Sequence, residues 1–171
     1  MKKLNLIMIS NKPVLLKNLF NVYEDHRGFL GTTNLDEVKK KTRGFDYAYK
    51  LSSFSKYKNT FRGLHYQARP HEQDKMLFIM SGKIKDFCVN LENLSEVKDF
   101  EAEAGDVIFI PSNYAHGFLT ISDNVFLEYF MNKTFKSTHY KGLNYKVLKS
   151  IGFPGNLIIS EKDLNLPTKV I

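Results

Sequence analysis

The segment FRGLHYQARPHEQDK, residues 61–75, brings together side chains that can exchange protons or hold anions. Histidine ordinarily has a pKa near neutrality, so His65 can serve as a base at physiological pH. Lys75, ten residues later, carries an ammonium group that can stabilise negative charge as it develops on an oxygen. His116 and Asp163 lie far along the chain, and a carboxylate on one ring nitrogen orients a catalytic histidine. If folding brings these groups together, the sequence predicts a site for proton transfer.

Strand geometry limits which of these side chains can share a surface. Successive side chains of a regular strand point to opposite faces, so Arg62 and His65 are predicted to diverge. A β-bulge at Gly63, between them, would bring both into one cleft. In the segment 125–131, the same alternation places Tyr129 on the face of the aliphatic residues.

Asp86 is predicted to lie on an apolar strand face with Ile84 and Cys88. A carboxylate among apolar neighbours needs either a buried hydrogen-bond partner or a functional role, and the sequence leaves both open. Cys88 is the single cysteine, so it forms no disulfide within the chain, and its apolar setting favours a packed thiol over a nucleophile.

Metal coordination is an alternative use for the histidines. The segment 105–116 is similar to the second motif of the cupin superfamily, whose metal-binding members carry two histidines two residues apart in their first motif. Here His65 is followed two positions on by Gln67, so that pair is absent. His71 and Glu72 lie in a proline-containing loop and make a poor rigid ligand set. The sequence therefore predicts no metal.

Composition indicates one globular domain over residues 1–171, with 43% hydrophobic and 25% charged residues. No apolar run approaches the ~18 residues that would cross a membrane, and polar residues interrupt the N-terminal segment where a signal peptide needs its apolar core. We therefore expect a cytoplasmic protein without membrane contact. The net charge of +7 favours anionic partners. The basic run at 39–43 contains no aromatic residue, so nucleic acid is not an expected partner.

Short apolar segments separated by turn residues dominate the chain, a pattern typical of an all-β sandwich or barrel. Strands are predicted over residues 4–10, 47–55, 60–67, 75–82, 83–91, 106–112, 117–122, 124–131 and 145–153. Two short helices are predicted at 35–41 and 161–165, the second with Ser160 as its N-cap. The tail from Phe153 onward is predicted to wrap over the domain or to contact a partner subunit.

Several motifs, taken in order, resemble the dTDP-4-dehydrorhamnose 3,5-epimerase family. They are EDHRGFL at 24–30, FRGLHYQ at 61–67, IPSNYAHGFLTIS at 110–122, FLEYF at 126–130 and SEKD at 160–163. The resemblance spans most of the chain and implies a cupin jelly roll that epimerises a sugar nucleotide without metal or cofactor, in the synthesis of deoxysugars and surface polysaccharides such as capsule. It also implies a homodimer that exchanges N-terminal strands, for which residues 4–10 supply an apolar edge strand.

The resemblance assigns catalytic roles to five residues. His65 is the base and Asp163 the carboxylate that orients it. Lys75 lies near the 4-keto oxygen of the sugar, and Asp86 stands beside the site. Tyr129 is the general acid, which donates a proton from the opposite face of the sugar once the enolate has formed.

The resemblance also implies a set of substrate-binding residues, namely Arg27, Arg62, Gln67, His116, Lys50 and Ser52. Arg27, Arg62 and His116 hold the diphosphate and the sugar, with Gln67 nearby. Two arginines suit a diphosphate because a guanidinium binds such oxygens in a bidentate manner. Lys50 and Ser52 stand where the family tends to have glutamine and asparagine.

Two departures from the family pattern bear on the substrate. The family commonly has a second tyrosine six residues after the first, and Phe135 stands there. The missing hydroxyl predicts inversion at a single carbon, C3 or C5, with C3 favoured. Thr32 replaces the glutamate that contacts thymine, so the nucleotide base stays open. We expect either a dTDP-linked hexose or a GDP-linked hexose or heptose, in each case a 4-keto-6-deoxy sugar.

Three other functions remain compatible with the sequence. A sugar-nucleotide 3,4-ketoisomerase would use the same fold and a histidine base, but would move the carbonyl. A cupin that only binds a sugar nucleotide would need no base at all. A metal-dependent cupin oxygenase would need the ligands that the first motif lacks.

Overall fold

The computed structural model of the chain describes residues 11–17, 19–34, 36–37, 40 and 45–170. The strand predicted over residues 4–10 lies outside these ranges, as does most of the helix predicted at 35–41. Among the described residues, no helix is long and apolar enough to span a membrane.

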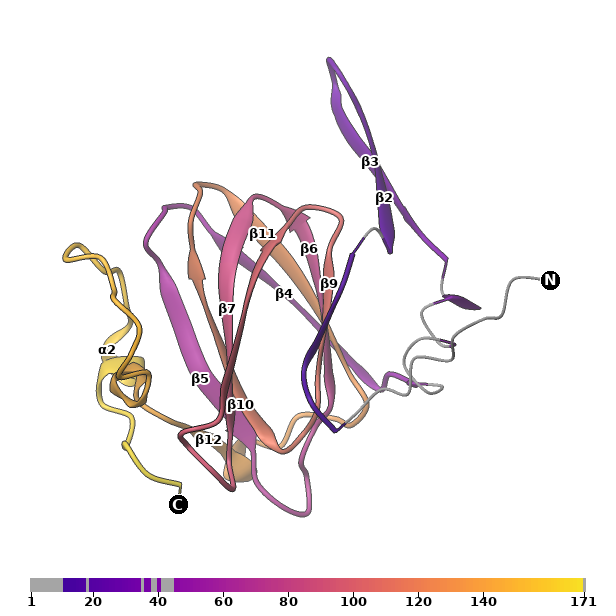
Figure 1. Ribbon diagram of the computed structural model, residues 1–171. Coiled ribbons are helices and arrows are strands. Elements are labelled where there is room, and N and C mark those ends of the chain that lie inside the picture. The colour runs from indigo at the N-terminus through magenta and orange to yellow at the C-terminus, as the bar shows by residue number, and fades with distance from the viewer. Residues whose placement is uncertain (1–10, 18, 35, 38–39, 41–44, 171) are drawn as a thin grey trace.

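Two five-stranded antiparallel sheets face each other, and a two-stranded hairpin projects away from them (Figure 1). The first sheet has the order β1-β9-β6-β11-β4, the second β12-β5-β10-β7-β8, and the hairpin pairs β2 with β3. The strand bounds are β1 Val14–Leu16, β2 Phe20–Asp25, β3 Gly28–Thr33, β4 Tyr49–Ser55, β5 Phe61–Gln67, β6 Lys75–Ser81, β7 Lys83–Asn90, β8 Val97–Glu103, β9 Val107–Ile110, β10 Tyr114–Thr120, β11 Val125–Met131 and β12 Tyr140–Gly142. The predicted all-β sandwich is confirmed.

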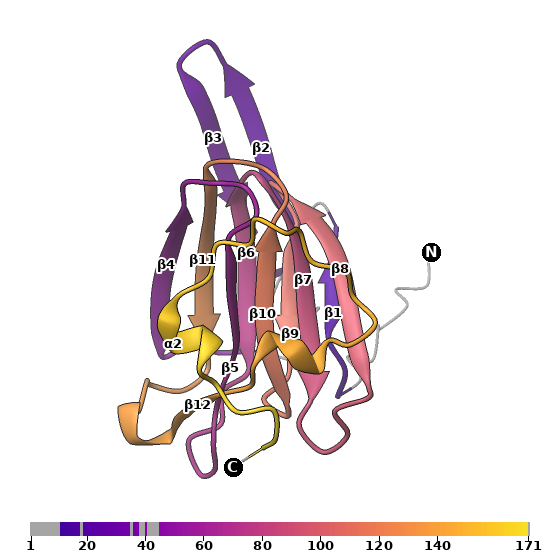
Figure 2. The ribbon, with the colours of Figure 1, turned by 90° about the vertical axis from the view of Figure 1, so that its left-hand side faces the viewer.

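Apolar side chains fill the space between the sheets and cover both outer faces. Leu77, Ile108, Phe118 and Leu127 are among the fully buried residues at the centre, where the two sheets meet. The outer face of the second sheet is covered by the chain between β12 and the C-terminal helix, which crosses in front of it in Figure 2. The predicted wrap of the tail over the domain is therefore confirmed.

The C-terminal helix α2 spans Glu161–Leu164 and begins after Ser160, as predicted. The hydroxyl of Ser160 accepts a hydrogen bond of 3.1 Å from the backbone N–H of Asp163. This cap stabilises the first turn because it satisfies one of the amide groups that the helix leaves unpaired. Since Asp163 lies in that turn, the cap also fixes the backbone that carries a predicted site residue.

The strand predicted over 145–153 is wrong. Residues Tyr145–Val147 form the 3-10 helix η2, and the following apolar side chains pack flat on the second sheet instead of pairing with it. Strand β8 was not predicted, because its sequence VKDFEAE is largely polar. It is an edge strand with mostly exposed side chains, so burial imposes little apolar pattern on it.

Candidate active site

A cavity of about 480 Å³ opens between the two sheets. Arg62 and His65 line it from β5 and His116 from β10, all in the second sheet. Lys75 lines it from β6 and Tyr129 from β11, both in the first sheet. The residues that the sequence predicts for proton transfer therefore meet in one cavity, on two opposing walls.

Strand pairing explains how these side chains come together. His65 pairs with His116 across β5 and β10, and paired residues of neighbouring strands project from the same face. On the opposite wall, Lys75 pairs with Met131, and Tyr129 lies two residues before Met131 on β11. Because side chains alternate with a period of two, Lys75 and Tyr129 project from the same face of the first sheet.

The predicted bulge at Gly63 is present. Three residue steps on β5, from Arg62 to His65, lie opposite two steps on β10, from Phe118 to His116. Gly63 has a φ of +136°, and a Cβ there would lie 2.4 Å from the Cα of Gly117. Only glycine fits this position, because it tolerates the positive φ and lets the two strands approach. The extra residue brings Arg62 and His65 to the same cavity.

His65 and Asp163 form a hydrogen-bonded pair. The distance from His65 Nε2 to Asp163 Oδ1 is 2.8 Å, and Asp163 Oδ2 accepts a 3.3 Å bond from the backbone N–H of Gly63. Burial lowers the pKa of His65 below its ordinary value, and the carboxylate of Asp163 only partly opposes that shift. Burial alone would raise the pKa of Asp163, but the bonds from His65 and Gly63 hold it below its usual value. With Asp163 ionised, Nε2 donates and Nδ1 is the nitrogen left to take up a proton.

His116 and Asp86 form a second such pair, deeper in the protein. His116 Nε2 lies 2.6 Å from Asp86 Oδ2, and Asp86 is fully buried. Asp86 does not itself line the cavity but lies directly behind His116, which does, and this agrees with its predicted place beside the site. Its buried partner is a side chain, not the backbone. The thiol of Cys88 donates a further bond of 3.4 Å to Asp86 Oδ1, and burial raises the pKa of that thiol well above its usual value.

On the cavity wall formed by the first sheet, Lys75 supplies a cation and Tyr129 an acid. Burial lowers the pKa of Lys75 to about 8, although its ammonium donates a 2.9 Å bond to the backbone oxygen of His65. Burial raises the pKa of Tyr129 well above its usual value, and the charge of Asp86 adds to the shift. At neutral pH Lys75 is therefore mainly a cation and Tyr129 a protonated phenol, so each can serve a substrate oxygen or carbon that becomes negative.

Lys50 and Ser52 do not line the cavity, and their predicted placement is wrong. In the register of β4 with β11, Lys50 pairs with Phe130 and Ser52 with Glu128. These residues project from the outer face, where the ammonium of Lys50 lies 2.6 Å from the carboxylate of Glu128. The cavity face of β4 carries the alternating residues Tyr49, Leu51 and Ser53 instead.

Arg27 also lies away from the cavity of its own chain. It sits at the turn of the β2–β3 hairpin, where its guanidinium pairs with Asp25 at 2.6 Å and remains largely exposed. Thr32 lies on β3 of the same hairpin and is exposed. The sequence predicted that Arg27 shares a substrate site with residues of the sandwich strands. Within one chain the structure separates them, because the hairpin projects from the sandwich (Figure 1).

Arg62 and Gln67 do line the cavity, but with different freedom. The guanidinium of Arg62 donates to Ser55 Oγ and to the backbone oxygen of Phe54, both at 3.1 Å, which fixes it and leaves further donors for a substrate anion. The amide of Gln67 bonds at both ends to backbone groups of neighbouring loops. Its predicted contact with substrate is therefore in competition with a structural role.

The sequence missed several polar residues of the cavity, among them Tyr140 and Lys162. The ring of Tyr140 lies 5.2 Å from the ring of His65, and the ammonium of Lys162 lies 4.3 Å from the centre of the Tyr140 ring. Lys162 directly precedes Asp163, so its place on the same helical turn was a usable signal. Tyr140 gave none, because β12 is only three residues long and follows an irregular segment.

His65 and His116 each pair with one carboxylate, that of Asp163 and that of Asp86. In the described part of the chain, no group of three or more histidine, cysteine, aspartate or glutamate side chains has an arrangement that could hold a metal ion.

Comparison with known proteins places these features in a family. The family model described as dTDP-4-dehydrorhamnose 3,5-epimerase matches residues 14–169. A curated relative of that name from Shigella flexneri is 29% identical over 154 residues, covering 84% of each chain. The solved structure of the Bacillus anthracis enzyme of that name, with TDP and PPi bound, has a TM-score of 0.78 and 25% identity, and the match covers 95% of this chain and 97% of that one. A structure of RmlC from Streptococcus suis in complex with dTDP-D-xylose has a TM-score of 0.73 and 26% identity, with 92% and 87% covered.

Proposed function

Because this chain belongs to the dTDP-4-dehydrorhamnose 3,5-epimerase family and is a sugar-nucleotide epimerase, we propose that it inverts a single carbon of a dTDP-linked 4-keto-6-deoxy sugar. The carbon is C3 or C5, next to the carbonyl, and the lack of a hydroxyl at Phe135 favours C3. The relatives above are named for dTDP sugars or were solved with dTDP compounds, which supports this nucleotide over GDP.

One observation carries the proposal: a base and an acid face each other across the cavity from opposite sheets. His65, oriented by Asp163, removes the proton next to the ketone, and the electron pair moves into an enolate. Tyr129 then donates its phenolic proton to the same carbon from the other side, which inverts it. Lys75 stabilises the enolate oxygen while it is negative, in a buried setting where such a charge is most effective.

Cations at the cavity supply a place for the diphosphate. Arg62 and Lys162 both line the cavity, on β5 and α2. We assign the diphosphate to this pair within one chain, because Arg27 is directed elsewhere. A diphosphate at this position would leave the sugar between His65 and Tyr129.

Solvent deuterium tests the function directly. The purified protein is incubated in deuterated buffer with 4-keto-6-deoxy sugars linked to dTDP or GDP, and the products are analysed by mass spectrometry and NMR. We expect deuterium and inversion at one carbon next to C4 of the dTDP sugar. Deuterium with a carbonyl moved to C3 would indicate a ketoisomerase instead. Binding without any deuterium incorporation would indicate a module that only binds the sugar nucleotide.

The pH dependence of kcat/KM is expected to form a plateau with two limits. His65 must be neutral to act as a base, and burial lowers its pKa, so the acid limb lies below the ordinary histidine value. Lys75 must be charged to stabilise the enolate, and its pKa of about 8 sets the alkaline limb. Activity is thus highest between the pKa of His65 and the pKa of Lys75, and it falls as pH rises through about 8. In Lys75→Met the remaining activity should lack this alkaline limb; an unchanged limb would contradict the assignment.

We also propose a homodimer, formed through the projecting hairpin. Tyr23, Phe29 and Leu30 are large apolar side chains on β2 and β3, and they are 59%, 46% and 65% exposed. Among the described strands, β4 lies at one edge of the first sheet, and it exposes Phe54. A hairpin of one subunit pairing with β4 of the other covers both surfaces, and brings Arg27 towards the other subunit's cavity. A cytoplasmic location stays part of the proposal.

Light scattering tests the dimer. The variant Phe29→Glu/Leu30→Glu is expected to run at the mass of one chain, while the unmodified protein runs at twice that mass. Val170→Lys, which changes another exposed apolar residue on the C-terminal tail, serves as the control and should stay dimeric. A monomeric unmodified protein would exclude the proposed interface.

A further inference from the structure

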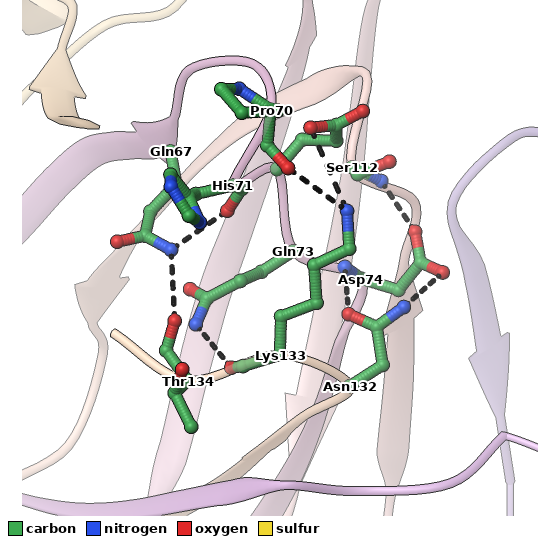
Figure 3. A network of polar contacts seen from close by, with 10 residues as sticks. Gln67, Pro70, His71, Gln73, Asp74, Ser112, Asn132, Lys133 and Thr134 are labelled. Carbon is green, nitrogen blue, oxygen red and sulfur yellow. Dashed lines mark hydrogen bonds and ion pairs between the residues drawn. The ribbon is translucent and has the colours of Figure 1, made fainter. Parts of the chain in front are cut away.

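The segment that follows β11 is held by the side-chain amides of Gln67, at the end of β5, and of Gln73, in the loop after it (Figure 3). This segment, residues 132–136, carries Phe135 and leads towards Tyr140, and both of these aromatic side chains line the cavity. The loop that holds it lies between β5 and β6 and contains residues 68–74. Side chains at both ends of that loop reach across to backbone groups of the segment.

Gln67 makes the central bridge. Its Nε2 donates to the backbone oxygen of His71 at 2.8 Å and to that of Thr134 at 3.5 Å. Its Oε1 accepts from the backbone N–H of Lys136 at 2.7 Å. Gln67 is 3% exposed, so these bonds satisfy an amide that would otherwise be buried without partners. They also place one bond on each side of Phe135.

Gln73 and Asp74 hold the start of the same segment. Gln73 is buried, and its Nε2 donates to the backbone oxygen of Lys133 at 2.6 Å. The backbone N–H of Asp74 donates to Asn132 Oδ1, and Asn132 Nδ2 donates back to Asp74 Oδ2, each at 2.9 Å. Asp74 also accepts a 2.8 Å bond from the backbone N–H of Ser112, which ties the pair to the end of β9. Asn132 and Asp74 do not line the cavity.

The held segment completes an aromatic wall of the cavity. The ring of Phe135 stacks on Tyr49 of β4 at 6.3 Å and meets Tyr140 edge-on at 5.4 Å. Tyr140 in turn contacts the base, His65. The wall therefore runs from the first sheet to the second, and Phe135 is the member contributed by a loop. Phe135 is 42% exposed, so burial alone does not fix it.

We infer that Gln67, Gln73 and Asn132 are positioning residues that hold the 132–136 segment and thereby set the aromatic wall against which the substrate lies. We call these three side chains the amide clamp. The inference rests on the proposed function, since the wall matters only if a sugar nucleotide occupies the cavity. It also reassigns Gln67 from a substrate ligand to a residue that acts through Phe135.

Three clamp variants and one control test this inference. In Gln67→Ala, Gln73→Ala and Asn132→Ala we expect KM for the dTDP sugar to rise about three- to tenfold, the loss expected for neutral hydrogen bonds, with kcat changed much less. Asn132 separates positioning from direct contact with substrate, because it does not line the cavity. Thr134→Ala changes an exposed side chain of the same segment but keeps the backbone oxygen that accepts from Gln67, so its KM should not change.

Backbone hydrogen exchange gives a readout that needs no activity. The amide of Lys136, which donates to Gln67, should exchange roughly tenfold faster in Gln67→Ala than in the unmodified protein or in Thr134→Ala. A rise in KM confined to Gln67→Ala, with unchanged exchange over 132–140, would make Gln67 a substrate ligand and overturn the clamp. Faster exchange with unchanged KM would overturn the role of the wall. If the unmodified enzyme incorporates no deuterium into substrate, the proposed function fails, whatever the exchange data show.

Discussion

Replacing His65 with asparagine is expected to lower kcat by roughly 10² to 10⁴, the range that a general base contributes. Asparagine is smaller and polar, and its side-chain N–H can still face Asp163, so the fold should persist while the basic nitrogen is lost. The measurement is the rate of deuterium incorporation into substrate, together with the affinity for dTDP. We expect incorporation to fall by this factor and dTDP affinity to stay within about threefold, since the base acts on the sugar.

Asp163→Asn is the graded companion of that variant. It leaves the base in place but removes the negative charge of the carboxylate, which orients His65 and accepts a bond from the Gly63 N–H. The loss in kcat should be substantial but smaller than for His65→Asn. If His65→Asn retained near-normal incorporation, His65 would not be the base, and the neighbouring His116 would become the candidate.

Tyr129→Phe is expected to separate proton removal from inversion. His65 can still abstract the proton and return a deuteron from the same side, so exchange should continue at a reduced rate. Inversion requires a donor on the opposite wall and should fall by about 10² or more. Product NMR distinguishes substrate that has exchanged with retention from product that has inverted. The phenol is buried, so phenylalanine fills the same space and the core around Tyr129 should be preserved.

Tyr140→Phe is the matched control, because Tyr140 also has a phenol in the cavity but lies beside His65, on the wall opposite Tyr129. It should keep inversion within about an order of magnitude. Loss of inversion in Tyr140→Phe together with normal inversion in Tyr129→Phe would place the acid on the wrong wall of the cavity. If both variants kept normal inversion, solvent would become the candidate for the proton donor.

The motifs of the sequence were sufficient to predict which side chains proposed for proton transfer lie at the cavity. His65, Lys75, Tyr129 and Asp163 were predicted from motifs that resemble a family, and the structure places all four side chains around one cavity. The bulge at Gly63 was predictable too, because glycine inside a strand pattern marks a close approach of two backbones. Their catalytic roles are the subject of the variants above.

The surroundings of these groups were less predictable. Lys50 and Ser52 were assigned one residue away from the cavity face, which belongs to Tyr49 and Leu51. An error of one residue reverses the direction of a strand side chain, and in a largely exposed edge strand no apolar pattern reveals the register. The register of β4 becomes clear from the pairing of Leu51 with Tyr129, and that pairing exists only in the folded sheet.

By itself, the sequence predicted most of the strands and the all-β fold, because both depend on residue type and local spacing. It also named the side chains proposed for proton transfer, through motifs that resemble a family. The tertiary structure decided which side chains share the cavity, since that depends on partners distant in sequence. It placed Asp86 behind His116 and Arg27 on a projecting hairpin, and it added Tyr140 to the wall. It also directed both ends of the Gln67 amide to the backbone of other segments, which no local pattern could show.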